Sequence, residues 1–144
     1  MQIPREAVDL IKQFEGCRLK SYRCPAGIWT IGYGNTGPDV VEGLVWTQDQ
    51  ADTCLVARLD DFAHDVDIVL TRTATHGQFG AMVSLAYNIG IGNFRKSSVL
   101  REHNTGNERA AADAFLMWNK GGGQVLPGLV TRRASERAMY LGEE

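Results

Sequence analysis

The sequence predicts an α+β fold: a small antiparallel β-sheet near the N-terminus, then a mainly helical lobe, with a cleft between them. The first observation is a change of period, because β-compatible runs occupy residues 19–33, whereas the flanking segments show helical spacing. The second is size, since 144 residues with 44% apolar content suit one compact domain with its own core. We expect a single domain over 1–144, with a β-lobe at about 15–46 and a helical lobe at about 47–144 that includes helix 4–14.

The N-terminal part predicts one short helix and one hairpin. Apolar residues at helical spacing predict the helix at 4–14, with Pro4 in its first turn. Two β-compatible runs follow at 19–23 and 28–33, and the Cys-Pro-Ala-Gly segment at 24–27 is typical of a hairpin turn. We expect a sheet of two or three strands.

A long acidic helix is predicted next. Thr47 and Gln50 have the spacing of a capping box, and the helix that they begin extends to about Leu70. Eight carboxylates and one arginine between Asp39 and Asp67 give this segment a local charge of −7. We interpret it as a solvated acidic face over a connecting helix.

The remainder predicts four more helices and one flexible loop. The first is apolar on most sides, which places it at the centre of its lobe. Ser97 or Ser98 caps the second, and three consecutive glycines at 121–123 predict the loop. The expected helices cover 78–90, about 98–106, 108–118 and 127–141.

Charge and composition exclude several classes of protein. With 15 basic against 17 acidic side chains, the net charge of −2 argues against a nucleic-acid binder, which is normally basic. No run of about 18 apolar residues occurs, so no membrane span is expected. The N-terminus lacks the basic region and apolar stretch of a secretory signal, which predicts synthesis and folding in a cytosol.

The cysteines and histidines predict neither a disulfide framework nor a metal centre. Three cysteines are an odd number for paired bridges, and we interpret Cys54, in a helical stretch, as a small core residue. The histidines are scattered without ligand spacing. Residues 32–37 match a dinucleotide fingerprint by letter but open no long helix, so no cofactor is expected.

Three polar residues around the hairpin carry the candidate chemistry. Glu15 ends the first helix, Cys24 lies at the hairpin turn, and Thr30 lies on the returning strand. Since a hairpin folds back toward the segment before it, these groups are able to converge. The residues alone leave another interpretation open, in which Glu15 is a surface carboxylate, Cys24 an ordinary turn residue and Thr30 an ordinary strand residue.

The segment from Glu15 to Thr30 resembles the signature of the phage-type lysozymes, the endolysins of glycoside hydrolase family 24. That signature is Glu, eight residues, Asp or Cys, five residues, then Thr. Residues 86–94 and 118–133 resemble the cleft-lining helix end and the C-terminal signature of the family. The resemblance implies a lysozyme-like fold and hydrolysis of the β-1,4 bond between N-acetylmuramic acid and N-acetylglucosamine in bacterial peptidoglycan, generally with inversion.

The resemblance also implies a role for each site residue. Glu15 would be the general acid, while Cys24 and Thr30 would handle the attacking water. Tyr87 and Asn88 match cleft positions and would contact substrate. Arg132 or Arg133 would either ion-pair with Glu15 or lie at the surface.

Two positions depart from the usual pattern of the family. Many members carry Asp where this chain has Cys24, and a thiol with a pKa near 8.5 is mostly neutral at pH 7. A thiol still holds a water, so catalysis remains the interpretation. Many members carry His where this chain has Asn35, which we expect to alter local hydrogen bonding and not the reaction.

The implied setting is lysis of a bacterial host at the end of phage infection. The enzyme would wait in the host cytoplasm, pass a membrane hole made by a holin and reach the wall from the periplasmic side, working as a monomer. Two alternatives stay open: a wall-binding module without catalysis, and a cysteine peptidase that uses Cys24 with a histidine. A bond between Cys17 and Cys24 would require the hairpin to refold, since an extended segment between them spans up to about 23 Å.

Overall fold

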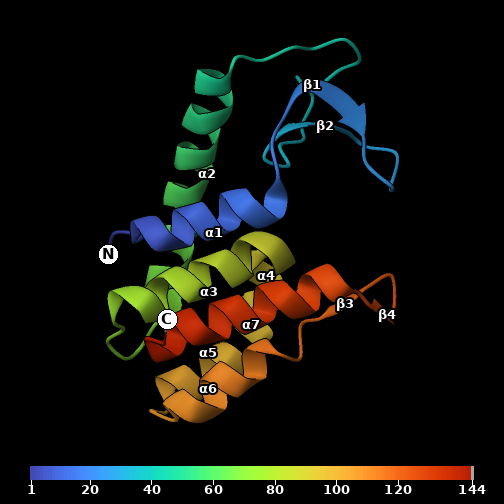
Figure 1. Ribbon diagram of the computed structural model, residues 1–144. Coiled ribbons are helices and arrows are strands. Elements are labelled where there is room, and N and C mark those ends of the chain that lie inside the picture. The colour runs from blue at the N-terminus through green and yellow to red at the C-terminus, as the bar shows by residue number, and fades with distance from the viewer. Residues whose placement is uncertain (144) are drawn as a thin grey trace.

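The computed structural model describes residues 1–143 and confirms the α+β fold, with a small antiparallel sheet beside a larger set of helices (Figure 1). The elements in chain order are α1 (Arg5–Glu15), β1 (Arg18–Arg23), β2 (Trp29–Gly32), α2 (Gln48–Val69), α3 (His76–Ile89), α4 (Ile91–Lys96), α5 (Ser98–Asn104), α6 (Glu108–Phe115), β3 (Lys120–Gly121), β4 (Gln124–Val125) and α7 (Pro127–Leu141).

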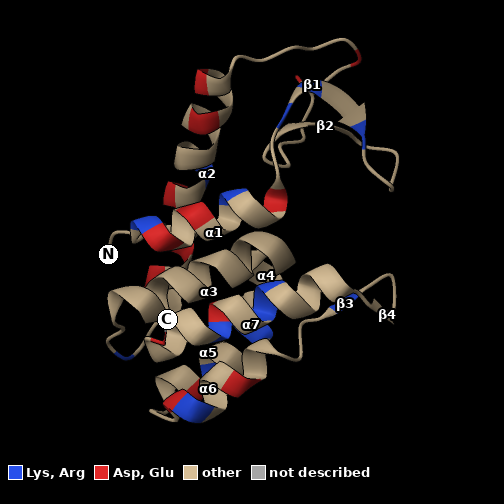
Figure 2. Cartoon of the chain, in the orientation of Figure 1, with Lys and Arg blue, Asp and Glu red and all other residues tan. Residues whose placement is uncertain are grey.

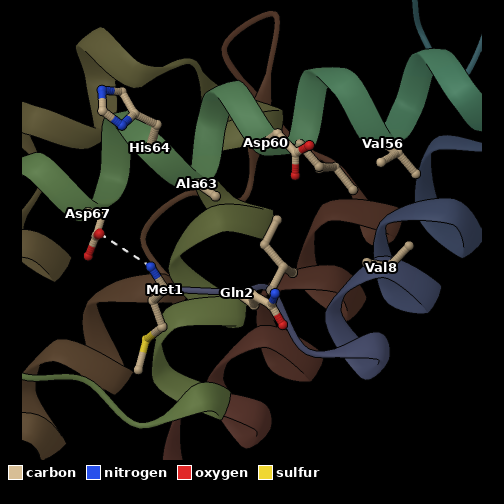
Figure 3. Close-up of a pocket in the computed structure, with 10 residues that line it drawn as sticks. Met1, Gln2, Val8, Val56, Asp60, Ala63, His64 and Asp67 are labelled. Carbon is tan, nitrogen blue, oxygen red and sulfur yellow. Dashed lines mark hydrogen bonds and ion pairs between the residues drawn. The ribbon is translucent and has the colours of Figure 1, made fainter.

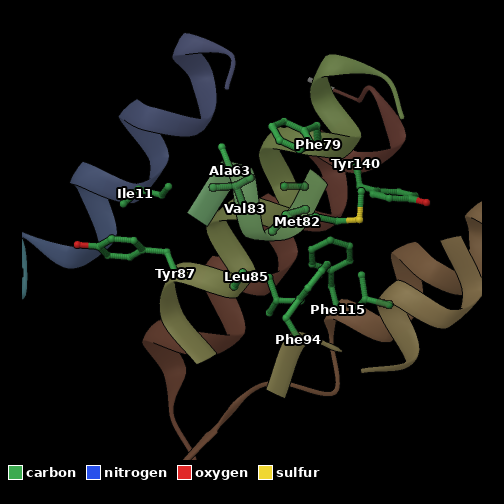
Figure 4. Close-up of a cluster of buried hydrophobic side chains, with 14 of the residues drawn as sticks. Ile11, Ala63, Phe79, Met82, Val83, Leu85, Tyr87, Phe94, Phe115 and Tyr140 are labelled. Atoms are coloured by element: carbon green, nitrogen blue, oxygen red, sulfur yellow. The ribbon is translucent and has the colours of Figure 1, made fainter. Parts of the chain in front are cut away.

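Helix α3 is the centre of the helical lobe, as its apolar composition predicts. Every residue from Gln78 to Tyr87 is buried, and α1, α2 and α7 all pack against this helix. Figure 4 shows Ile11 of α1 and Tyr140 of α7 turned toward the same cluster. Because α1 ends in Glu15, this packing determines where that carboxyl group lies.

The hairpin forms where the sequence predicts it. The turn closes through hydrogen bonds from the Cys24 N–H to the Ile28 carbonyl at 2.9 Å and from the Gly27 N–H to the Cys24 carbonyl at 2.7 Å. Gly27 has φ +80°, a left-handed conformation that suits glycine. An isolated antiparallel bridge pairs Lys20 of β1 with Val45, next to the two-stranded sheet.

Helix α2 has the predicted start and the predicted acidic face. The Thr47 side chain accepts a hydrogen bond from the Gln50 N–H, and the Gln50 side chain accepts one from the Thr47 N–H, so the capping box is complete. Acidic residues, coloured red in Figure 2, recur along α2, and most of them are exposed. Within residues 1–143, no helix combines the length and the apolar composition that crossing a bilayer requires.

Several sequence predictions were wrong in detail. Residues 121–123 are not simply a loop, because β3 and β4 pair as a hairpin around Gly122 and Gly123. Helix α4 was not predicted, and Gly90, with φ +90°, separates it from α3. The helix expected at 108–118 ends at Phe115. Cys54 is half-buried at the surface of α2 and not part of the core.

Replacing Gly80 with alanine is expected to destabilise the contact between α1 and α3. A Cβ atom at this position would lie 2.8 Å from both Ala7 Cβ and Pro4 Cγ, so the two helices would have to separate. We expect Gly80→Ala to lower the free energy of unfolding by about 1–3 kcal/mol in urea titrations. Gly92→Ala is the control, because open space surrounds that helical position. Equal stability of the two variants would contradict the tight approach of α1.

Candidate active site

Glu15 lies at the C-terminal end of α1, between the helical lobe and the β-lobe. The following residue, Gly16, has φ +69° and turns the chain into β1. The Glu15 side chain is 19% exposed, and its Oε2 accepts a hydrogen bond from Arg132 Nη1 at 2.5 Å. Gly34 lies against the other carboxylate oxygen, since a Cβ there would be 3.4 Å from Glu15 Oε1. The carboxyl group therefore lies between Arg132 of the helical lobe and Gly34 of the β-lobe.

A buried cluster of charged residues lies behind Glu15. Glu136 Oε2 accepts hydrogen bonds from Ser84 Oγ at 2.5 Å, Arg132 Nε at 3.3 Å and Arg133 Nη2 at 3.0 Å. Arg133 Nε lies 2.7 Å from Glu136 Oε1. Complete burial raises the pKa of the Glu136 carboxyl, and the two guanidinium groups oppose that rise. Burial also lowers the pKa of Arg133, which the charge of Glu136 opposes.

Glu15 and Asn88 share one pocket. Asn88 is exposed at the end of α3, and its Oδ1 accepts a hydrogen bond from Arg133 Nη1 at 3.0 Å. The pocket has a volume of about 330 Å³ and is lined by Phe14, Glu15, Asn88, Leu126, Gly128, Leu129 and Arg132. Among the described residues, Cys24, Thr30 and Tyr87 do not line it. A larger pocket of about 460 Å³ lies between Val8 of α1 and Val56 of α2 and includes none of the predicted site residues (Figure 3).

Cys24 and Thr30 form a second group in the hairpin. Thr30 is 4% exposed and donates its hydroxyl proton to the Ile28 carbonyl at 3.0 Å, which leaves oxygen lone pairs free to accept. The Thr30 hydroxyl is also within hydrogen-bonding reach of the Cys24 thiol. The backbone N–H groups of Ile28 and Ala26 lower the pKa of that thiol below its ordinary value. The Cys24 thiol therefore ionises more readily than the thiol of an isolated cysteine.

Tyr87 links α3 to the β-lobe. Its hydroxyl donates to the Tyr33 carbonyl at 2.7 Å and accepts from Arg58 Nη1 at 2.8 Å. The same Arg58 nitrogen lies 3.4 Å from Asn35 Oδ1, so Asn35 takes part in this network. Burial raises the pKa of Tyr87 to about 12, and the hydroxyl stays protonated near neutral pH. The two neighbouring residues thus differ in exposure, because Tyr87 is only 8% exposed whereas Asn88 is exposed.

Sequence reasoning left one question open and missed two residues. Of the two candidate arginines, Arg132 contacts Glu15, whereas Arg133 contacts Asn88. Ser84 and Glu136 were not predicted. The available signal was the spacing of Glu136, four residues after Arg132 and three after Arg133, which puts all three side chains on neighbouring positions of one helix face. Over residues 1–143 no cluster of three or more His, Cys, Asp or Glu side chains is arranged to hold a metal ion.

Solved structures with this fold define the class of the protein. The chain aligns with the muramidase domain of SpmX from Asticaccaulis excentricus at 40% identity and a TM-score of 0.89, covering 97% of both chains. It aligns with the active form of the P1 phage endolysin Lyz at 26% identity and a TM-score of 0.87, covering 99% of this chain and 86% of that one. The secreted inactive form of Lyz gives a TM-score of 0.66 at 25% identity, covering 98% and 96%. The fold is that of the lysozyme-like proteins.

The family follows from the sequence comparisons. The model of the Phage lysozyme family matches residues 12–136, and the chain belongs to this family. It is 42% identical over 146 residues to the endolysin of Bacillus phage B103 and 38% identical over 145 residues to that of Salmonella phage P22. The match covers 98% of this chain and 99% of the P22 endolysin. It covers 100% of this chain and 56% of the B103 endolysin, so the chain spans little more than half of that relative.

The Cys24 thiol is expected to be the most readily alkylated of the three. All three cysteines are free, and Cys17 is more exposed than Cys24. Because backbone amides stabilise the Cys24 thiolate, iodoacetamide at pH 7 should modify Cys24 roughly threefold or more faster than Cys17, measured by peptide mass spectrometry. In urea the two rates should converge. Faster modification of Cys17 in the folded protein would contradict the environment described for the turn.

Proposed function

We propose that the protein is a muramidase that hydrolyses the β-1,4 bond between N-acetylmuramic acid and N-acetylglucosamine in bacterial peptidoglycan. The observation that carries the proposal is Glu15, a carboxyl group in a pocket, held by Arg132 from one lobe with Gly34 of the other lobe close by. Membership of the phage lysozyme family supports it, as do the names endolysin and muramidase of the relatives. No cofactor is proposed.

Glu15 supplies the proton for the leaving group in this proposal. It protonates the glycosidic oxygen as the bond from that oxygen to the anomeric carbon breaks, and positive charge develops on the sugar ring. The pocket that Glu15 lines also contains Asn88, whose exposed amide is suited to contact a sugar hydroxyl or N-acetyl group. Tyr87, with its hydroxyl engaged by Tyr33 and Arg58, contributes by holding the β-lobe loop in place.

Cys24 and Thr30 handle the water that replaces the leaving group. Since the Thr30 hydroxyl donates to the Ile28 carbonyl, its oxygen is able to accept a hydrogen bond from a water and orient that water toward the anomeric carbon. The negative charge of the Cys24 thiolate stabilises the developing oxocarbenium ion, and the thiolate takes the proton that the water loses. Attack from the side opposite the leaving group inverts the anomeric centre.

The proposed setting is the wall of a phage-infected bacterium. The protein would stay in the host cytoplasm until a holin opens the membrane and would then act on peptidoglycan from the periplasmic side, as a monomer. The phage origin and endolysin names of several relatives support this setting.

Substitution of Glu15 by glutamine should abolish the release of reducing ends from purified peptidoglycan. Loss of a general acid typically costs about 10²–10⁴-fold in rate, whereas Glu6→Gln, on an exposed position of the same helix, should keep wild-type activity. Cys24→Ser should lose activity, and Cys24→Asp, which restores the commoner residue of the family, should retain more.

The products separate the proposed function from its alternatives. New amino groups that depend on Cys24 would indicate a peptidase, and wall binding without either product would indicate a binding module. Either result, or full activity of Glu15→Gln, would contradict the muramidase proposal.

A further inference from the structure

Glu136 is a carboxyl group with no exposed surface on the side of α7 that faces α3. Its side chain is 0% exposed, and it contacts two guanidinium groups and one hydroxyl, from Arg132, Arg133 and Ser84. Removing one partner from a buried ion pair is costly, because the other charge is left uncompensated in a medium of low polarity. The site described so far assigns Glu136 no part in the reaction.

The two arginines lead from Glu136 to the two polar residues of the pocket. Arg132 uses Nε for Glu136 and Nη1 for Glu15. Arg133 uses Nε and Nη2 for Glu136, and its Nη1 reaches the Asn88 side chain at 3.0 Å. Each guanidinium group therefore has one side on Glu136 and another on a pocket residue. A planar fork held at several nitrogens has little freedom left to rotate.

The charges of this cluster balance only with Glu136 included. When Glu15 is ionised, Glu15 and Glu136 supply two negative charges against the positive charges of Arg132 and Arg133. The groups that face Glu136 are Arg132 and Arg133 on α7 and Ser84 on α3, and Glu15 on α1 is reached through Arg132. Without the negative charge of Glu136, Glu15 would be the sole carboxylate in contact with Arg132 among the described residues.

We propose that Glu136 is a positioning residue for the hydrolysis: its charge holds Arg132 against Glu15 and Arg133 against Asn88. The inference rests on the proposed muramidase function. By drawing part of the Arg132 charge toward itself, Glu136 keeps Glu15 able to carry the proton that the leaving group needs. Through Arg133 it orients the Asn88 amide toward the sugar. Glu136 itself touches no substrate.

The pair Glu136→Gln and Glu136→Asp tests this role through the dependence of activity on pH. Glutamine keeps the size and removes the charge, so Arg132 stabilises ionised Glu15 more strongly. The alkaline limb of the pH profile for reducing-end release should then move down by roughly one unit. The rate at pH 7 should fall roughly tenfold. Aspartate keeps the charge, so the limb should stay in place even where the rate falls.

Asn88→Ala tests the proposed link from Glu136 through Arg133 to the exposed Asn88 side chain. It should raise KM and leave the alkaline limb unchanged. Asp113→Asn is the matched control, since it removes the ion pair between Asp113 of α6 and Arg137 of α7, the residue next to Glu136, and should change neither quantity. Thermal unfolding of each variant establishes that the assays are done on folded protein.

A purely structural role predicts a different pattern. Glu136→Gln and Glu136→Asp would then lose activity in step with stability, and the alkaline limb would coincide with that of the wild type. That result in an active wild type would overturn the positioning role and leave the muramidase proposal intact. A wild type that releases no reducing ends would overturn both.

Carbon-13 NMR of the wild type gives an answer even where the glutamine variant fails to fold. The Glu136 carboxyl carbon, assigned by through-bond experiments, should report an ionised group over the whole pH range in which the protein is active. A Glu136 carboxyl that is neutral at the pH of maximal activity would overturn the proposal, because a neutral group attracts neither arginine.

Discussion

The Arg132 guanidinium is the group on which the rest of the site depends. It is 2% exposed, and its counter-ions come from two helices, Glu15 of α1 and Glu136 of its own α7, with the Ser84 carbonyl of α3 as a further acceptor. Breaking a buried pair of this kind costs about 3–5 kcal/mol. Since α1, α3 and α7 must all be packed before these contacts exist, folding of the helical lobe and assembly of the pocket are one event.

The hairpin of the β-lobe carries the other two residues of the proposed chemistry, Cys24 and Thr30. The hairpin turn supplies the backbone N–H groups that stabilise the Cys24 thiolate, and the returning strand supplies Thr30. The position of this lobe relative to α3 depends on the bond between the Tyr87 hydroxyl and the Tyr33 carbonyl, and on Gly34 beside Glu15. The carboxyl group of Glu15, the proposed acid, thus lies where the two lobes approach each other.

The sequence predicted those features that depend on interactions within a few residues, such as the starts of helices. The capping box at Thr47 located the start of α2, and Pro127 located the start of α7, because both signals act within a few residues. The two-residue strands β3 and β4 escaped prediction, since two residues have no measurable period. The short helix α4 escaped because Gly90 and Gly92 resemble a loop.

Contacts between residues that are far apart in the sequence were not predictable from residue spacing. Glu15 and Arg132 are 117 residues apart, so spacing alone left Arg132 and Arg133 equivalent. Glu136 resembled one more charged residue on a helix, although it is fully buried. Cys54 was assigned to the core from its residue type, yet the rotation of α2 leaves it at the surface. Each of these depends on how helices pack, which no single segment specifies.

In the proposed mechanism the acid and the water lie on opposite faces of the scissile bond, and the anomer formed first tests this directly. Proton NMR of a defined peptidoglycan fragment, recorded during the first minutes of hydrolysis, distinguishes α from β reducing ends before they interconvert. We expect the new N-acetylmuramic acid end to appear first as the α anomer, because attack opposite a β-linked leaving group inverts the centre. First appearance of the β anomer would contradict the proposed roles of Glu15, Cys24 and Thr30.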